Sequence, residues 1–370
     1  MFDFLPDFLR TPVAFVIVLG VLVFIHELGH YLAARWVGVH VETFSIGFGR
    51  AIASWTDRRG TLWKVAWIPL GGFVKLHGQE RPEDVSAEER ALWQPGRTFH
   101  EKTVGARALV VAAGPAANFL LAAVLFAFLF AATGRPVNVP VVGEVVAGSA
   151  AARAGLQVGD RIEAIDGAAI TRFEQIQQIV AASPGRQLRL DVASGGASHD
   201  VLLTPDTREA GGRQVGVLGI RANAVEYEQL SLLEAVPAGI VQTWDVTAQT
   251  LAGVWQMISQ NRGTEDLGGP LRIAQLSGQV AQLGLASLVS FIAVLSVNLG
   301  LINLFPIPVL DGGHLLFYLA EAVRGRPLPP RAQEYGFRAG LALILGLFVF
   351  ATWNDLTHIG LFRWVAGVLG

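Results

Sequence analysis

Apolar residues gather in four stretches of the chain. They cover residues 11–37, 108–132, 285–323 and 337–352, the last being the shortest. A bilayer core of about 30 Å needs about 20 helical residues, so this pattern predicts about four transmembrane helices. We expect the first stretch to be retained and not cleaved as a signal peptide, because its leader is acidic and no Ala-x-Ala-like site ends it.

The connection between the first two stretches contains two apolar runs with weak alternation, at residues 39–46 and 61–76. Alternating runs broken by glycine predict a β-hairpin. Such a hairpin either dips into the membrane or forms a small sheet lying on the bilayer, and the sequence leaves both open. The edge of the sheet is able to pair with an extended substrate, which makes Gly71 and Gly72 candidate substrate-binding positions.

Residues 134–224 have the pattern of a compact globular module. Strands are expected near 141–146, 161–165, 188–192 and 199–203, with a helical turn near 149–154 and a helix near 173–182. The string Ala-Gly-Leu-x-x-Gly-Asp-x-Ile-x-x-Ile-Asp-Gly at 154–167 resembles a PDZ domain. That resemblance implies a groove that binds a peptide strand by β-augmentation, with Gly216, Leu218 and Gly219 at its carboxylate-binding edge. A groove that serves only as a steric cap is the alternative.

Residues 230–262 place apolar side chains at helical spacing with polar interruptions, which predicts an amphipathic helix on the outer face of the membrane. The fold class is therefore a multi-pass α-helical membrane protein of about four transmembrane helices, with a membrane-associated β-hairpin region and one inserted PDZ domain (α+β). The expected parts are 1–37 (first span), 38–107 (hairpin region and loop), 108–133 (second span), 134–224 (PDZ domain), 225–284 (amphipathic helix and linker), 285–323 (broken third span), 324–336 (loop) and 337–370 (fourth span and tail).

Composition agrees with a membrane protein: 52% of residues are apolar, 16% are charged, and the mean hydropathy is +0.46. The net charge of −2 and the lack of a basic tract argue against nucleic acid as a partner. Cysteine is absent, which excludes disulfides and cysteine-ligated metals. Basic residues cluster in the 38–107 and 324–336 connections, so both termini and the inserted domain are predicted to face away from the cytoplasm.

The first span contains His26-Glu27-Leu28-Gly29-His30. On a helix this spacing sets two imidazoles on one face, where both bind one Zn²⁺, and Glu27 is positioned as the general base for a water activated by the metal. Ionisable residues at membrane depth are costly, so they are rarely without a role.

A third ligand is expected from the broken third span. Two prolines and two glycines interrupt it around Asp311, and a carboxylate at this depth needs a cation. His26, His30 and Asp311 would form a catalytic type of zinc site, with one open position. Asn303 is a candidate for holding substrate or the developing oxyanion, or else forms an interhelical amide contact. His314 is either an outer neighbour of the site or an interior helix residue.

Together these motifs resemble the site-2 protease family, in particular its bacterial regulator-of-sigma-E branch. The resemblance rests on His-Glu-Leu-Gly-His, Gly-Pro-x-x-Asn at 114–118, the PDZ-like insert and Asn-x-x-Pro-x-Pro-x-Leu-Asp-Gly-Gly at 303–313, and it covers essentially the whole chain. It implies an intramembrane zinc metalloprotease of the bacterial inner membrane. The implied substrates are single-pass membrane proteins already cut by another protease, such as anti-sigma factors and remnant signal peptides. The insert has room for one PDZ domain, whereas such relatives often carry two.

Two other functions compete with proteolysis. A non-catalytic PDZ scaffold would lack a ligand or the glutamate, and all four residues are present. A zinc transporter would carry aligned polar positions across several spans, and the second and fourth spans contain almost none.

Overall fold

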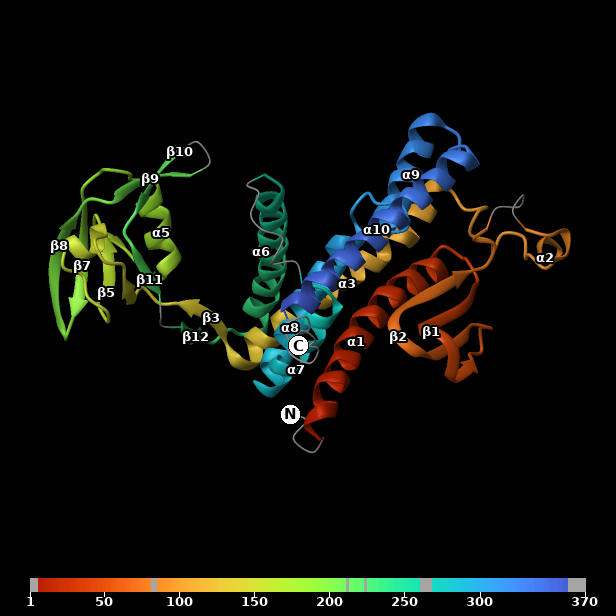
Figure 1. The fold of residues 1–370 in the computed structure, drawn as a ribbon, viewed down its shortest axis with the longest axis horizontal. Coiled ribbons are helices and arrows are strands. Elements are labelled where there is room, and N and C mark those ends of the chain that lie inside the picture. The colour runs from red at the N-terminus through yellow and green to blue at the C-terminus, as the bar shows by residue number, and fades with distance from the viewer. Residues whose placement is uncertain (1–5, 81–84, 211–212, 223–224, 260–267, 359–370) are drawn as a thin grey trace, which may run out of the picture. The chain divides into compact units, whose positions relative to one another are not determined.

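The structure is a computed structural model that describes residues 6–80, 85–210, 213–222, 225–259 and 268–358. It divides into two compact units (Figure 1). Unit 1 comprises Met1–Leu129 and Leu232–Gly370, and unit 2 comprises Phe130–Ser231. The leader residues 1–5 and the predicted tail beyond residue 358 lie outside the described residues.

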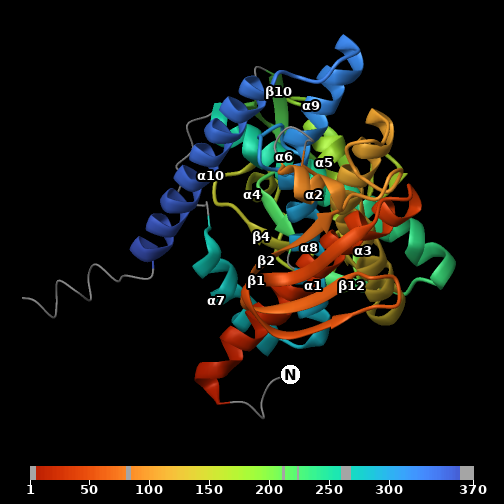
Figure 2. The ribbon, with the colours of Figure 1, turned by 90° about the vertical axis from the view of Figure 1, so that its right-hand side faces the viewer.

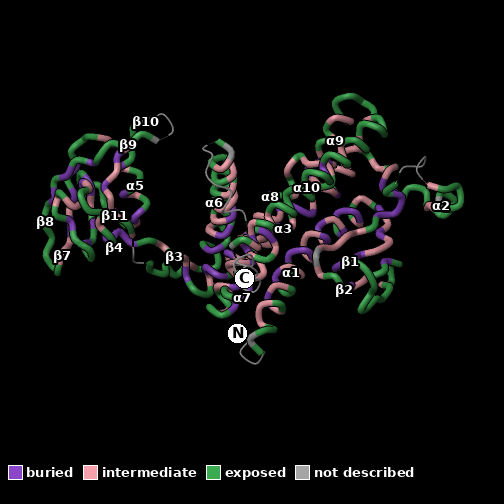
Figure 3. The backbone as a smooth tube through the Cα atoms, viewed as in Figure 1, coloured by how far each residue is buried: buried purple, intermediate pink, exposed green. Residues whose placement is uncertain are grey.

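Within the described residues, four helices are long and apolar enough to cross a membrane, as the sequence predicts. They are α1 (Asp7–Trp36), α3 (Val104–Thr133), α8 (Leu285–Asn303) and α10 (Pro330–His358). In the apolar window of α8, 39% of residues are buried, compared with 6% in that of α10. The third span is therefore central in unit 1 and the fourth is peripheral, which Figure 3 shows as a scarcity of buried residues along α10.

The third apolar segment is broken, as predicted. Helix α8 ends at Asn303 and α9 (Asp311–Arg324) begins after a short turn-rich connection. Pro306 and Pro308 lie in this connection, and neither has a backbone N–H to continue the helical ladder. The break thus follows directly from the sequence.

The predicted hairpin is longer than expected. Strands β1 (Val41–Thr56) and β2 (Leu62–Leu76) pair antiparallel, with several bulges. Residues 43–46 pair with 72–75 and also with 62–65, so the two strands fold into a curved sheet that passes beside α1 (Figure 2). The short helix α2 (Ala87–Ala91) follows in the connection to α3.

Helix α6 (Leu232–Ser259) confirms the predicted helix in this region, and the structure packs it along two spans. A Cβ at Gly239 would overlap the α3 backbone at Ala123, and Thr250 donates a 3.0 Å hydrogen bond to the side chain of Asn298 in α8. Helix α7 (Pro270–Gln282) comes next, in a segment that the sequence indicates only as a linker. It begins where Asp355 of α10 accepts the Gly269 backbone N–H at 2.8 Å.

Unit 2 contains the expected strands and helices around its own apolar core. Its largest sheet has the order β6-β5-β7-β8, and three further strand pairs join β4 to β11, β9 to β10 and β3 to β12. The elements are β3 (Arg135–Asn138), β4 (Val142–Val145), α4 (Ala150–Arg153), β5 (Arg161–Ile165), β6 (Ala168–Ala169), α5 (Phe173–Ala181), β7 (Leu188–Ser194), β8 (Ala197–Leu203), β9 (Asp206–Ala210), β10 (Arg213–Val217), β11 (Ile220–Ala222) and β12 (Val225–Glu228).

Candidate metal centre

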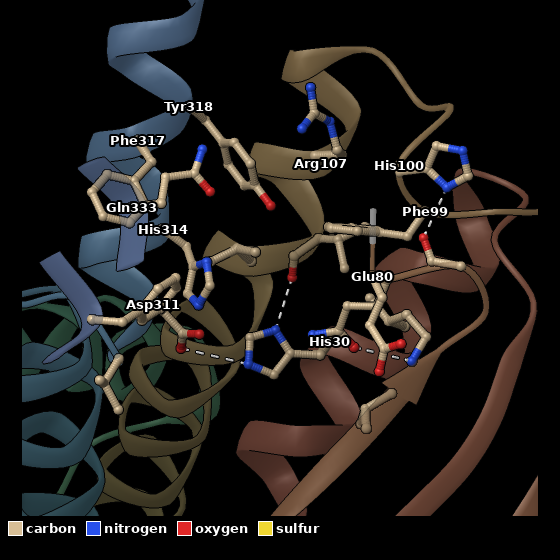
Figure 4. A pocket seen from close by; sticks show the side chains of 18 of the residues that line it. His30, Glu80, Phe99, His100, Arg107, Asp311, His314, Phe317, Tyr318 and Gln333 are labelled. Atoms are coloured by element: carbon tan, nitrogen blue, oxygen red, sulfur yellow. Dashed lines mark hydrogen bonds and ion pairs between the residues drawn. The ribbon is translucent and has the colours of Figure 1, made fainter. Parts of the chain in front are cut away.

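Two imidazoles and one carboxylate converge in unit 1. His26 and His30 lie one turn apart on α1, with their Nε2 atoms separated by 3.3 Å. Asp311 is the first residue of α9, and its Oδ2 lies 3.2 Å from Nε2 of His26 and 3.5 Å from Nε2 of His30. Figure 4 shows the Asp311 carboxylate pointing at the His30 ring. The structure therefore brings together the three residues that the sequence nominates as ligands.

The three atoms have the spacing that a zinc ion requires. Tetrahedral zinc holds nitrogen and oxygen ligands at about 2.0–2.2 Å, which sets the ligand atoms about 3.3 Å from one another. Oδ2 of Asp311 is buried and has no hydrogen-bond partner, an arrangement that a carboxylate tolerates when it faces a cation. This is the one cluster of three potential metal ligands found among the described residues. The donor set fits zinc.

The break between α8 and α9 sets the position of Asp311. Val309 has a φ of +97°, a conformation that costs a β-branched residue energy and persists only when its surroundings impose it. A Cβ at Gly312 would overlap the carbonyls of residues 304–305, and one at Gly313 would overlap the carbonyl of Ile307. The first turn of α9 therefore packs directly against the backbone of the connection between α8 and α9.

A backbone carbonyl of α3 orients the second histidine. Nδ1 of His30 lies 2.9 Å from the carbonyl oxygen of Val110, so Nδ1–H donates and Nε2 keeps its lone pair for a metal. Helices α1 and α3 approach closely because glycines face each other's helix. A Cβ at Gly29 would overlap Ala113, and a Cβ at Gly114 would overlap the imidazole of His30.

Glu27 is buried, with 9% of its surface exposed, and it lines the same cavity as both histidines. This cavity has a volume of about 2120 Å³, and Asn303 lies in its wall. A Cβ at Gly72 of β2 would lie 3.1 Å from Cγ of Glu27, so the strand passes directly beside the glutamate. Gly71, which precedes it, has a φ of +117° and lies against Phe48.

Charged side chains line the cavity farther from the histidines. Burial alone would raise the pKa of Glu42, but its contacts with His77 at 2.8 Å and Lys75 at 2.9 Å lower that pKa overall. On the other side, Arg107 of α3 forms a 2.7 Å ion pair with Glu321 of α9. These ion pairs could not be predicted from the sequence, because their members lie far apart along the chain and share no local pattern.

The remaining predicted residues fall in two places. His314 lines the cavity, with its ring 5.3 Å from that of Phe337. Gly216, Leu218 and Gly219 lie in unit 2. The Leu218 side chain belongs to the core of that unit at 4% exposure, and the carbonyls of Leu218 and Gly219 already accept backbone hydrogen bonds from within the unit.

Comparisons with known proteins match this chain to one family of peptidases and to several metalloproteases. The model of peptidase family M50 matches residues 14–347. A Rhizobium meliloti protein named as a zinc metalloprotease is 44% identical over 367 residues, covering 94% of this chain and 97% of the relative. The metalloprotease MmpA of Caulobacter vibrioides is 39% identical, covering 98% and 99%. The regulator of sigma-E protease RseP of Salmonella typhimurium is 33% identical, covering 94% and 98%.

Proposed function

Because the chain belongs to peptidase family M50, the site-2 proteases, and is a zinc metalloendopeptidase, we propose that it cuts membrane-embedded polypeptides. The bond cleaved lies within or next to the transmembrane segment of a single-pass membrane protein. The observation that carries this proposal is the convergence of His26, His30 and Asp311 beside Glu27, with the histidines and the glutamate on a helix apolar enough to span a bilayer.

In this proposal, His26, His30 and Asp311 hold zinc, and Glu27 is the general base. Zinc held there supplies a Lewis acid that polarises a peptide carbonyl and lowers the pKa of water toward neutrality. The Glu27 carboxylate takes a proton from the attacking water and returns it to the leaving amine. Glu27 lies in the wall of the same cavity as both histidines, within reach of a water bound there.

The substrate must present an extended backbone, because a helix hides its carbonyls in i→i−4 hydrogen bonds. Residues 72–76 of β2 line the cavity and pair with β1 along one side, and no other described strand pairs with them. We assign this edge, with Gly71 and Gly72, to hold the unwound substrate by β-augmentation. The Asn303 amide, in the wall of the same cavity, holds the substrate backbone or the oxyanion.

As the resemblance to the site-2 proteases implies, we expect the substrates to be single-pass proteins already shortened by another protease, including anti-sigma factors and remnant signal peptides. We expect the basic connections at 38–107 and 324–336 to face the cytoplasm, with both termini and unit 2 in the periplasm of a bacterial inner membrane. Unit 2 acts as a PDZ domain in this proposal. Its segment at 216–219 either recruits a substrate end or blocks substrates whose outer domain is intact.

The decisive experiment compares the wild type with Glu27→Gln on a tagged single-pass substrate in detergent, with bound zinc measured in both. We expect zinc to be retained and the cleavage rate to fall about 10²–10⁴-fold, since the amide cannot accept the proton. Equal cleavage rates for the two proteins would show that Glu27 is not the general base. Substrate binding without cleavage by the wild type would favour a scaffold.

A further inference from the structure

One face of α3 lies against both histidines of the metal centre. Val110, Gly114 and Asn118 follow one another at four-residue spacing, so they form a single stripe on the helix. Val110 accepts the Nδ1–H of His30, and Gly114 leaves room for the His30 ring. Asn118 is the next residue of this stripe, and its side chain reaches the other histidine.

The Asn118 side chain is fully buried, at 0% exposure, and its amide nitrogen lies 3.2 Å from Nδ1 of His26. The amide oxygen Oδ1 is also buried and has no hydrogen-bond partner. The residue is held in place from the side of α8, because the hydroxyl of Ser296 donates a 2.8 Å hydrogen bond to the Asn118 backbone carbonyl. A buried amide can form hydrogen bonds only with the few polar groups next to it.

The chemistry of the histidine decides which end of the amide faces it. His26 meets the other two ligands through Nε2, so Nε2 must carry the lone pair and Nδ1 the proton. The neighbour of Nδ1 must then be an acceptor, and Oδ1 is the only acceptor atom in an asparagine side chain. A half-turn of the amide exchanges its nitrogen and oxygen without changing its shape, which brings the unpartnered Oδ1 to Nδ1–H.

We propose that Asn118 is a positioning residue for the zinc site. Its Oδ1 accepts the Nδ1–H of His26 and so fixes the tautomer and ring orientation of that ligand. Outer partners of this kind make a histidine more basic and hold it in register with the metal. Helix α3 would then orient both histidines, one through a backbone carbonyl and the other through an amide. This inference rests on the proposed role of His26 as a ligand.

The test measures the zinc dissociation constant of the full chain in detergent by competition with a chromogenic chelator. The chain has no cysteine, so no thiol competes for the metal. The informative variants are Asn118→Leu, which removes the acceptor, and Asn118→Asp, which accepts but cannot donate when ionised. Ser296→Ala is the matched control, because it disturbs packing at the same level while leaving the amide intact.

We expect Asn118→Leu to weaken zinc binding about 10–100-fold, and Asn118→Asp and Ser296→Ala to stay within about threefold of the wild type. The absorption spectrum of the Co²⁺-substituted protein should change in the leucine variant alone. His26→Ala, titrated alongside, tests the ligand assignment separately.

Three results would overturn the proposal. These are wild-type affinity in Asn118→Leu, a loss in Asn118→Asp of more than about tenfold, or a loss in Ser296→Ala equal to that of the leucine variant. The second would mean that the amide donates, and the third that helix packing controls the site. If the leucine variant does not fold, the aspartate and alanine variants still decide between these roles.

Discussion

Gly114 has no side chain, yet it controls where an imidazole of the metal centre lies. Its Cα faces the ring of His30 so closely that a methyl group there would overlap the ring. The ring is also tied by Nδ1 to the Val110 carbonyl, so it cannot move aside without losing that hydrogen bond. The position of the His30 imidazole thus depends on the absence of a side chain at residue 114.

Substituting Gly114→Ala should therefore weaken zinc binding by about tenfold or more, the range seen when the partners of a ligand are disturbed. Gly105→Ala is the matched control in the same helix, because a methyl group there has no described neighbour within 4 Å. Zinc titration of both variants checks the expectation. Equal affinities would show that the His30 ring has room to shift.

At the scale of elements, the position of Asp311, the proposed third ligand, depends on how α10 packs on the break between α8 and α9. A Cβ at Gly340 of α10 would overlap the carbonyl of Pro308, three residues before Asp311. The strained φ of +97° at Val309 lies between these two residues. The peripheral helix α10 in this way packs against the connection that leads to Asp311.

We expect Gly340→Ala to lower the cleavage rate by about 10²-fold, because a displacement of about 1 Å at a reacting centre has an effect of this size. Helical content should stay unchanged. Gly346→Ala lies on the same helix, has no described neighbour within 4 Å, and should cleave substrate at the wild-type rate. The same rate in both variants would mean that the break absorbs the added methyl group.

At the scale of the whole molecule, the proposed zinc site would join parts of unit 1 that the chain separates widely. His26 and His30 belong to α1, whereas Asp311 follows the break after α8. A ligand that binds only the folded state stabilises it by an amount that grows with the logarithm of its free concentration divided by its dissociation constant. The metal centre should therefore contribute to stability as well as to catalysis.

Removing zinc with a chelator should lower the thermal unfolding midpoint in detergent, by the equivalent of about 2.7 kcal/mol when free zinc was at 100 times its dissociation constant. Returning zinc should restore the midpoint. The double variant His26→Ala, His30→Ala should not respond to either treatment. If the chelator leaves the wild-type unfolding midpoint unchanged, bound metal does not contribute to the stability of the fold.

Local features of the sequence were sufficient for much of this molecule. Four apolar stretches, a pair of prolines and a His-Glu-x-x-His motif act over a few residues, so the apolar helices, the broken helix and the pairing of His26 with His30 on one helix face were predictable. Asp311 was predictable for a different reason: a carboxylate in an apolar segment needs a cation, and the histidine pair lacked a third ligand.

The tertiary structure alone decided which partners those residues have. The contacts of His30 with Val110, His26 with Asn118 and Arg107 with Glu321 join elements far apart in the chain, and no local pattern encodes them. The packing of α6 along α3 and α8 is of the same kind. Periodicity and residue type determine what an element is and which groups it carries, whereas the distances between elements arise only when the whole chain is packed.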